Sequence, residues 1–89
     1  MQPQRQPENS NESRICDLYM AACLVTAQVK FHNTSVVNNR IYFHFNNDEG
    51  MVDRIKREYL ARQLQIDALS FSDNIKSLKS YCAEILKRK

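Results

Sequence analysis

Residues 29–47, VKFHNTSVVNNRIYFHFNN, decide the class of fold. β-branched and aromatic residues dominate the stretch, which is typical of strands, and Asn38-Asn39 lies in its middle. Asparagine tolerates the left-handed backbone of a tight turn, so the stretch predicts a β-hairpin. In its second half, alternate residues are apolar and should face a core: Ile41, Phe43 and Phe45.

Two turns are compatible with this hairpin, and they give different registers. A two-residue loop, Asn38-Asn39, pairs Phe45 with His32, whereas a three-residue loop that includes Val37 pairs Phe45 with Phe31. A slip of one residue reverses the faces of a strand. We favour the three-residue loop, because it places Phe31 on the core face together with Phe45.

The favoured register gives the outer face of the hairpin a mixed chemistry. His32 and His44 lie opposite each other there, and Lys30, Arg40 and Tyr42 share the face. Facing residues have Cβ atoms about 5 Å apart, which suits two ligands of one metal. No third ligand is evident on this face, although a dimer could supply another pair. The plainer interpretation is two polar residues on a solvated sheet face.

The residues before the hairpin form a tail and a helix. Residues 1–13 are polar, carry both prolines and predict a disordered tail, so that residues 14–89 form a single domain. Ser13 or Asp17 would cap the helix that follows. That helix is apolar nearly all round, which predicts burial on more than one side, either in the core or in a dimer interface.

The residues after the hairpin predict a helix, a strand and a second helix. Asp48 is the expected N-cap of the first helix, and its apolar stripe begins at Met51. Leu64, Ile66 and Ala68 alternate and predict a third strand. A capping box from Ser70 to Asp73 would start the last helix. The predicted fold is α+β, a small antiparallel sheet with helices packed on one face and the order helix-strand-strand-helix-strand-helix.

Several short motifs follow one another along the chain: DLYMAA at residues 17–22, Phe43 and Phe45 in the expected strand, Tyr59, Asp67, Phe71, and LKS at residues 78–80. In this order they resemble a family of small α+β domains of unknown function from bacteria and their phages. The family has glycine after its first helix, near Gln28 here, and proline where this chain has Ala68. The resemblance implies the architecture and no activity.

Composition argues against most enzymes and cofactor sites. One glycine, Gly50, cannot build a phosphate-binding loop. Cys16, Cys23 and Cys82 are odd in number and have no C-x-x-C spacing, which argues against a disulfide framework or zinc finger. We expect them to be buried thiols in a reducing, cytoplasmic compartment. No nucleophile and base stand out, so we expect no enzyme and no cofactor. The longest apolar run, residues 18–25, is too short to cross a membrane.

Charge leaves two classes of partner open. The net charge is +3, and residues 70–89 account for all of it, with five cations against two acidic side chains. Cations near a helix C-terminus are favoured by the helix dipole whatever the function. We therefore expect a small interaction module that docks a protein partner or self-associates, and we keep nucleic-acid binding as the alternative. The candidate nucleic-acid residues are Lys30, Arg40, Tyr42, Lys76, Lys79, Lys87, Arg88 and Lys89.

Overall fold

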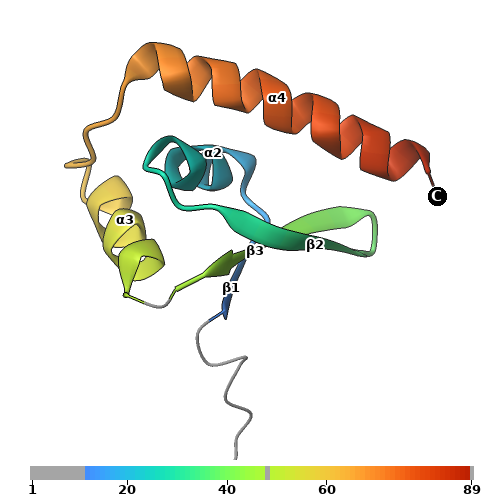
Figure 1. The fold of residues 1–89 in the computed structure, drawn as a ribbon, viewed down its shortest axis with the longest axis horizontal. Coiled ribbons are helices and arrows are strands. Elements are labelled where there is room, and N and C mark those ends of the chain that lie inside the picture. The colour runs from blue at the N-terminus through green and yellow to red at the C-terminus, as the bar shows by residue number, and fades with distance from the viewer. Residues whose placement is uncertain (1–11, 48, 89) are drawn as a thin grey trace, which may run out of the picture.

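The computed structural model describes residues 12–47 and 49–88. Three strands form one antiparallel sheet in the order β1-β3-β2: β1 (Glu12–Ile15), β2 (Phe31–Val37) and β3 (Arg40–Asn46). Three helices complete the fold: α2 (Leu18–Thr26), α3 (Met51–Leu60) and α4 (Ala68–Lys87). Helices α2 and α4 lie over the same face of the sheet, and α3 lies at one end (Figure 1). The predicted α+β class is confirmed.

The hairpin combines features of both registers considered from the sequence. Its turn has two residues, Asn38-Asn39, both left-handed, and Thr34 pairs with Phe43, so the three-residue loop is wrong. A β-bulge next to Phe31 then adds one residue to β2, and Phe31 pairs with Phe45 as predicted. The bulge returns Phe31 to the core face, where its ring centroid lies 5.0 Å from that of Phe43 and 5.9 Å from that of Phe45.

The third strand comes from a different part of the chain than predicted. Residues 64–67 are neither strand nor helix, and Ala68 already begins α4. Instead, β1 pairs with β3, with Ile15 opposite Phe43. Glu12 and Ser13 therefore belong to the sheet, which corrects their assignment to a disordered tail, while residues 1–11 of that tail lie outside the described residues.

Helix α2 is the central element of the core, as its apolar sequence predicts. Asp17 caps it, since Asp17 Oδ1 accepts hydrogen bonds from the backbone N–H groups of Tyr19 and Met20 at 2.9 and 3.4 Å. Residues 20–24 are all buried, which places neighbours on more than one side of the helix. After the helix, Gln28 has φ 75°, a conformation for which glycine is the usual residue.

The two later helices begin differently from the sequence prediction. Gly50 is the N-cap of α3, and Asn47 Oδ1 accepts from the Val52 N–H at 3.0 Å; the predicted cap, Asp48, lies outside the described residues. Helix α4 starts at the N-cap Asp67, before the predicted capping box, because Asp67 Oδ2 accepts from the Ser70 N–H at 2.8 Å. Among the helices that the structure describes, none is long and apolar enough to cross a membrane.

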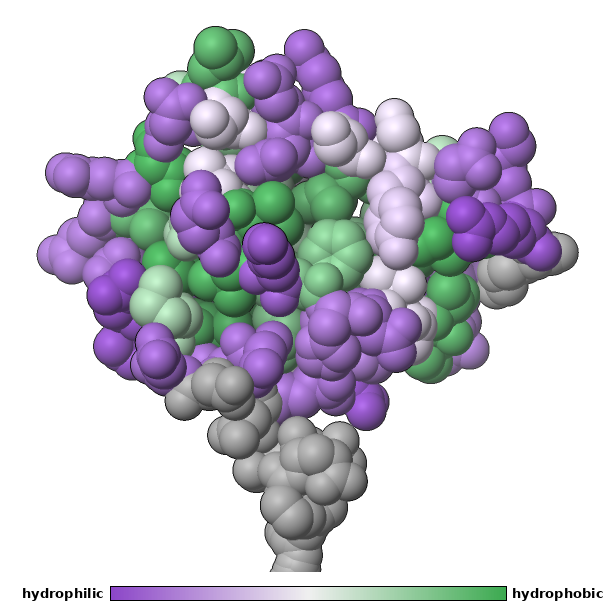
Figure 2. Space-filling model, in the orientation of Figure 1, coloured by the Kyte–Doolittle hydropathy of each residue, from purple (hydrophilic) through white to green (hydrophobic). Residues whose placement is uncertain are grey.

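The core lies between the sheet and the helices, and α4 packs mainly against α2. Leu78 is the buried residue of α4, and Asn74 Nδ2 donates to Thr26 Oγ1 of α2 at 2.9 Å. Hydrophobic side chains reach the surface between α2, α4 and the hairpin (Figure 2). The buried hydrophobic residues are Ile15, Met20, Ala21, Ala22, Cys23, Leu24, Ile41, Phe43, Phe45, Val52, Ile55 and Leu78.

Candidate functional site

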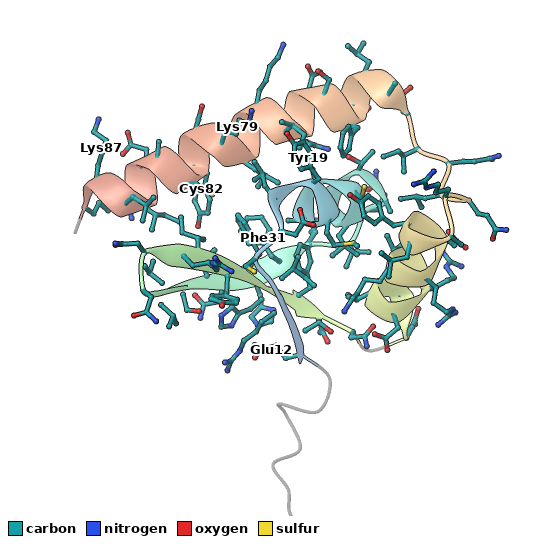
Figure 3. All side chains as sticks on the ribbon, turned by 180° about the vertical axis from the view of Figure 1, so that it is seen from behind. Glu12, Tyr19, Phe31, Lys79, Cys82 and Lys87 are labelled. Atoms are coloured by element: carbon teal, nitrogen blue, oxygen red, sulfur yellow. The ribbon has the colours of Figure 1, made fainter. Side chains whose placement is uncertain are left out.

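A carboxylate on β1 joins the two histidines of the hairpin. Glu12 lies on the side of the sheet away from α4 (Figure 3). Its Oε2 accepts from His32 Nε2 at 3.0 Å and lies 3.3 Å from His44 Nδ1, and its Oε1 lies 3.6 Å from Arg14 Nε. The hydrogen bond from His32 is the main reason why the pKa of Glu12 lies below its ordinary value. Desolvation raises this pKa, whereas His44 and Arg14 lower it further. Glu12 is therefore ionised near neutral pH.

His44 is held at both ring nitrogens. Besides the contact of its Nδ1 with Glu12, its Nε2 lies 2.8 Å from Ser35 Oγ. An ionised carboxylate only accepts, so in the neutral ring Nδ1 carries the proton and Nε2 is the acceptor. Ser35 then donates its hydroxyl proton to Nε2. The side chains of Ser35, His44 and Glu12 thus form one directed chain of hydrogen bonds across three strands.

The predicted pair of metal ligands takes a different arrangement from the one expected. Asn33, not His32, lies opposite His44, because His32 falls in the β-bulge. The two rings are perpendicular, with centroids 6.3 Å apart, and His44 is only 8% exposed, so it is not a solvated side chain. Within residues 12–47 and 49–88, no group of three or more His, Cys, Asp or Glu side chains is arranged to hold a metal ion.

The second candidate site is a groove under the C-terminal half of α4. At 1.5 Å per residue, the 20-residue α4 is about 30 Å long, whereas the nine-residue α2 is about 14 Å. The last turns of α4 therefore project beyond α2 and lie over the end of the hairpin. A groove of about 330 Å³ separates them. Its lining is Cys16, Leu18, Asn38, Asn39, Arg40, Ile41, Phe43, Cys82 and Leu86.

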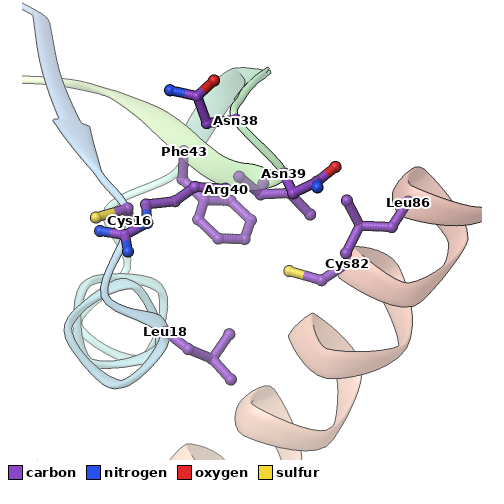
Figure 4. A pocket seen from close by; sticks show the side chains of 9 residues that line it. Cys16, Leu18, Asn38, Asn39, Arg40, Phe43, Cys82 and Leu86 are labelled. Carbon is purple, nitrogen blue, oxygen red and sulfur yellow. The ribbon is translucent and has the colours of Figure 1, made fainter. Parts of the chain in front are cut away.

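The groove has an apolar floor and a polar rim. Cys82 and Leu86 of α4 face Phe43 across it, while Arg40 and Cys16 lie at the opposite wall (Figure 4). Leu86 is 40% exposed, which is high for a leucine beside a core. Arg40 is the charged side chain among the described residues that line the groove. An apolar surface with one cation suits a partner segment that combines apolar and acidic groups.

The residues proposed for nucleic-acid binding are spread over the molecule. Lys30 directly precedes β2, and Arg40 pairs with Val37 at the other end of that strand. The two side chains are therefore separated by the length of a seven-residue strand, about 20 Å. Lys79 and Lys87 point away from the sheet on the outer side of α4 (Figure 3). The candidate cations that the structure describes, Lys30, Arg40, Lys76, Lys79, Lys87 and Arg88, are all exposed, and Tyr42 is half-buried. Lys89 lies outside the described residues.

The cysteines differ in their surroundings, which partly corrects the expectation that all three are buried. Cys23 is buried and Cys82 is half-buried, and burial raises the pKa of both thiols. Cys16 is exposed at the rim of the groove. All three are free thiols, as their odd number and spacing indicate.

Sequence reasoning missed Glu12 and Ser35. Glu12 was hidden because its polar neighbours made β1 look like part of a tail. Glu12 and Arg14 alternate with Ser13 and Ile15, but four residues are too short a signal to predict a strand. Ser35 was missed because its contact with His44 is diagonal across the hairpin and depends on the two-residue turn.

Comparisons of the chain with protein-family models, with curated proteins and with solved structures find no match. The resemblance to small bacterial and phage domains therefore stays a prediction.

Proposed function

We propose that the protein is an interaction module that docks a partner protein in the groove between the C-terminal half of α4 and the end of the hairpin. The observation that carries the proposal is the 330 Å³ groove itself, with Leu86 left 40% exposed at its edge. Burial of apolar surface drives most protein association, and an amphipathic helix or loop is a common occupant of such a groove.

The charge at the groove supports a partner with acidic groups over a second copy of this chain. A symmetric dimer through this groove would bring two copies of Arg40 together. Like charges at an interface cost free energy, whereas an Asp or Glu on a different partner would be attracted to Arg40. We therefore favour a partner segment with apolar anchors beside acidic residues.

A peptide-display selection against the purified protein tests this proposal. We expect enriched peptides to carry apolar residues next to Asp or Glu. Their binding should be lost in Leu86→Ser and in Arg40→Glu. Leu69→Ser is the matched control, because Leu69 is an exposed leucine (72%) at the other end of the same helix.

Three results would contradict the proposal. The first is an absence of any enriched peptide, and the second is equal binding of peptides by the Leu86→Ser and Leu69→Ser variants. The third is dimerisation that sedimentation detects and that Leu86→Ser abolishes, which would assign the groove to a second copy instead.

Nucleic-acid binding has weaker support, because the candidate cations do not form one continuous surface. Lys30 and Arg40 are about 20 Å apart, and Lys79 lies on the outer side of α4, away from the sheet (Figure 3). Titration of a labelled oligonucleotide at low and moderate salt separates the two functions. Binding that weakens steeply with salt would favour the nucleic acid, since phosphate contacts release counterions.

A further inference from the structure

The face of the sheet away from α2 and α4 holds three side chains in the arrangement that activates a serine. Ser35 Oγ lies 2.8 Å from His44 Nε2, and His44 Nδ1 lies 3.3 Å from Glu12 Oε2. A nucleophile within hydrogen-bond reach of a base, with the base oriented by a third group, is the geometric signature of nucleophilic catalysis. This face is separate from the groove under α4, since neither Ser35 nor Glu12 lines that groove.

From this geometry we propose that Ser35, His44 and Glu12 form an acyl-transfer site that cleaves small activated esters. Ser35 is the nucleophile, His44 is the general base, and Glu12 is the positioning residue that fixes the ring of His44. His32 and Arg14 hold the carboxylate of Glu12 from two further sides, at 3.0 and 3.6 Å. The orientation of the base is therefore determined by contacts with two other strands.

The reaction balances with water as the second reactant. Ser35 Oγ attacks the ester carbonyl while His44 Nε2 accepts the hydroxyl proton. Collapse of the tetrahedral intermediate breaks the bond to the leaving alcohol, which takes that proton from His44. Water then attacks the acyl-serine with His44 again as the base, the acid is released, and Ser35 recovers its proton.

The position of Ser35 defines the substrate class. Ser35 is half-buried in edge strand β2 on the face away from α2 and α4, so a small ester reaches it without passing through the core. Tyr42 is its direct cross-strand neighbour. At this position, an ester with a good leaving group demands the least stabilisation of the oxyanion. Aryl acetates fit this description, and bulky or unactivated esters do not.

Hydrolysis of p-nitrophenyl acetate, together with labelling by a fluorophosphonate, tests the proposal. We expect the intact protein to release p-nitrophenol faster than buffer and to carry the phosphonyl group on Ser35, as located by mass spectrometry. Ser35→Ala should remove the label and lower the protein-dependent rate about 100-fold, the usual scale for loss of an assisted nucleophile. Ser77→Ala, a change at an exposed serine of α4, is the matched control and should leave both unchanged.

The control variant separates a loss of catalysis at Ser35 from a loss of folding. Ser35→Ala and Ser77→Ala should have circular dichroism spectra similar to that of the intact protein, so that a difference in hydrolysis rate between them does not come from unfolding. Equal hydrolysis by the Ser35→Ala variant and the intact protein would overturn the proposal, as would a label on any residue other than Ser35. Either result would mean that the three side chains only hold the strands together.

The dependence of the hydrolysis rate on pH tests the role of Glu12, because a purely structural contact would not affect it. Glu12→Gln should lower the rate and change its dependence on pH, because the amide no longer selects the tautomer with a free Nε2. Glu12→Asp should recover part of the rate. An unaltered pH profile in the active Glu12→Gln variant would remove Glu12 from the site.

Discussion

Truncation of two leucines in α4 measures how the helix is attached. Leu78 is 6% exposed and packs in the core, whereas Leu86 is 40% exposed at the edge of the groove. Leu78→Ala removes buried methyl and methylene groups and leaves a cavity, which costs about 3 kcal/mol. Leu86→Ala removes groups that are partly in water and leaves no enclosed cavity, so we expect a cost of about 1 kcal/mol.

Urea denaturation followed by circular dichroism gives both free energies of unfolding. We expect similar slopes for the two variants and a clearly lower midpoint for Leu78→Ala. Equal losses of about 3 kcal/mol would refute the reasoning, because Leu86 would then be as well packed as Leu78. If the loss in free energy of unfolding caused by Leu86→Ala grows with protein concentration, a second copy of the chain covers the groove.

Three further predictions concern individual local interactions. Because the folded pKa of Glu12 lies below its ordinary value of 4.5, its contribution to stability is present above that pH and is lost as the pH falls through the folded pKa; Glu12→Gln should lower the melting temperature at neutral pH, and the difference from the original protein should shrink as the pH falls below 4.5. Asp67→Ala should cost about 1 kcal/mol by chemical denaturation through loss of the α4 cap, while Asp73→Ala, at an exposed position within α4, should cost less than half of that. Gly50→Ala should cost about 1 kcal/mol through its left-handed φ of 69° alone, because an added Cβ would meet no atom within 4 Å, and a variant as stable as the original protein would contradict this.

The hairpin could be predicted because local rules specify it. Alternation of Ile41, Phe43 and Phe45 identifies the core face, and Asn38-Asn39 identifies the turn. The register was predicted wrongly near the turn, because the sequence offers two ways to place Phe31 beside Phe45. A longer loop and a β-bulge both insert one residue, and no local preference distinguishes them.

The strand β1 could not be predicted from residues 12–15 alone. Four residues with one buried side chain, Ile15, are too few for their alternation to identify a strand, and the pairing with β3 supplies what the local sequence lacks. The expected strand at residues 64–68 failed for the opposite reason. Leu64 and Ile66 alternate, yet the Asp67 cap begins α4 at Ala68 and leaves too few residues to pair.

The candidate sites depend on this tertiary pairing. The sequence indicated that His32 and His44 lie close together, and their ring centroids are 6.3 Å apart. The carboxylate between them belongs to β1, so an error in one strand hid the chemistry of both histidines. The groove follows from the difference in length between α2 and α4, a property of two helices together that neither segment shows alone.

The central position of β3 has a consequence for the order of folding. Its contacts with β2 close a two-residue turn, whereas its contacts with β1 join Ile15 to Phe43 across the whole of α2. Closing the longer loop costs more chain entropy. The hydrogen bonds that offset this cost can form only after the hairpin has folded and β3 is available to pair with β1. We therefore expect β1 to dock late, so that the hydrogen bonds of Glu12 slow unfolding of the finished domain more than they accelerate its formation.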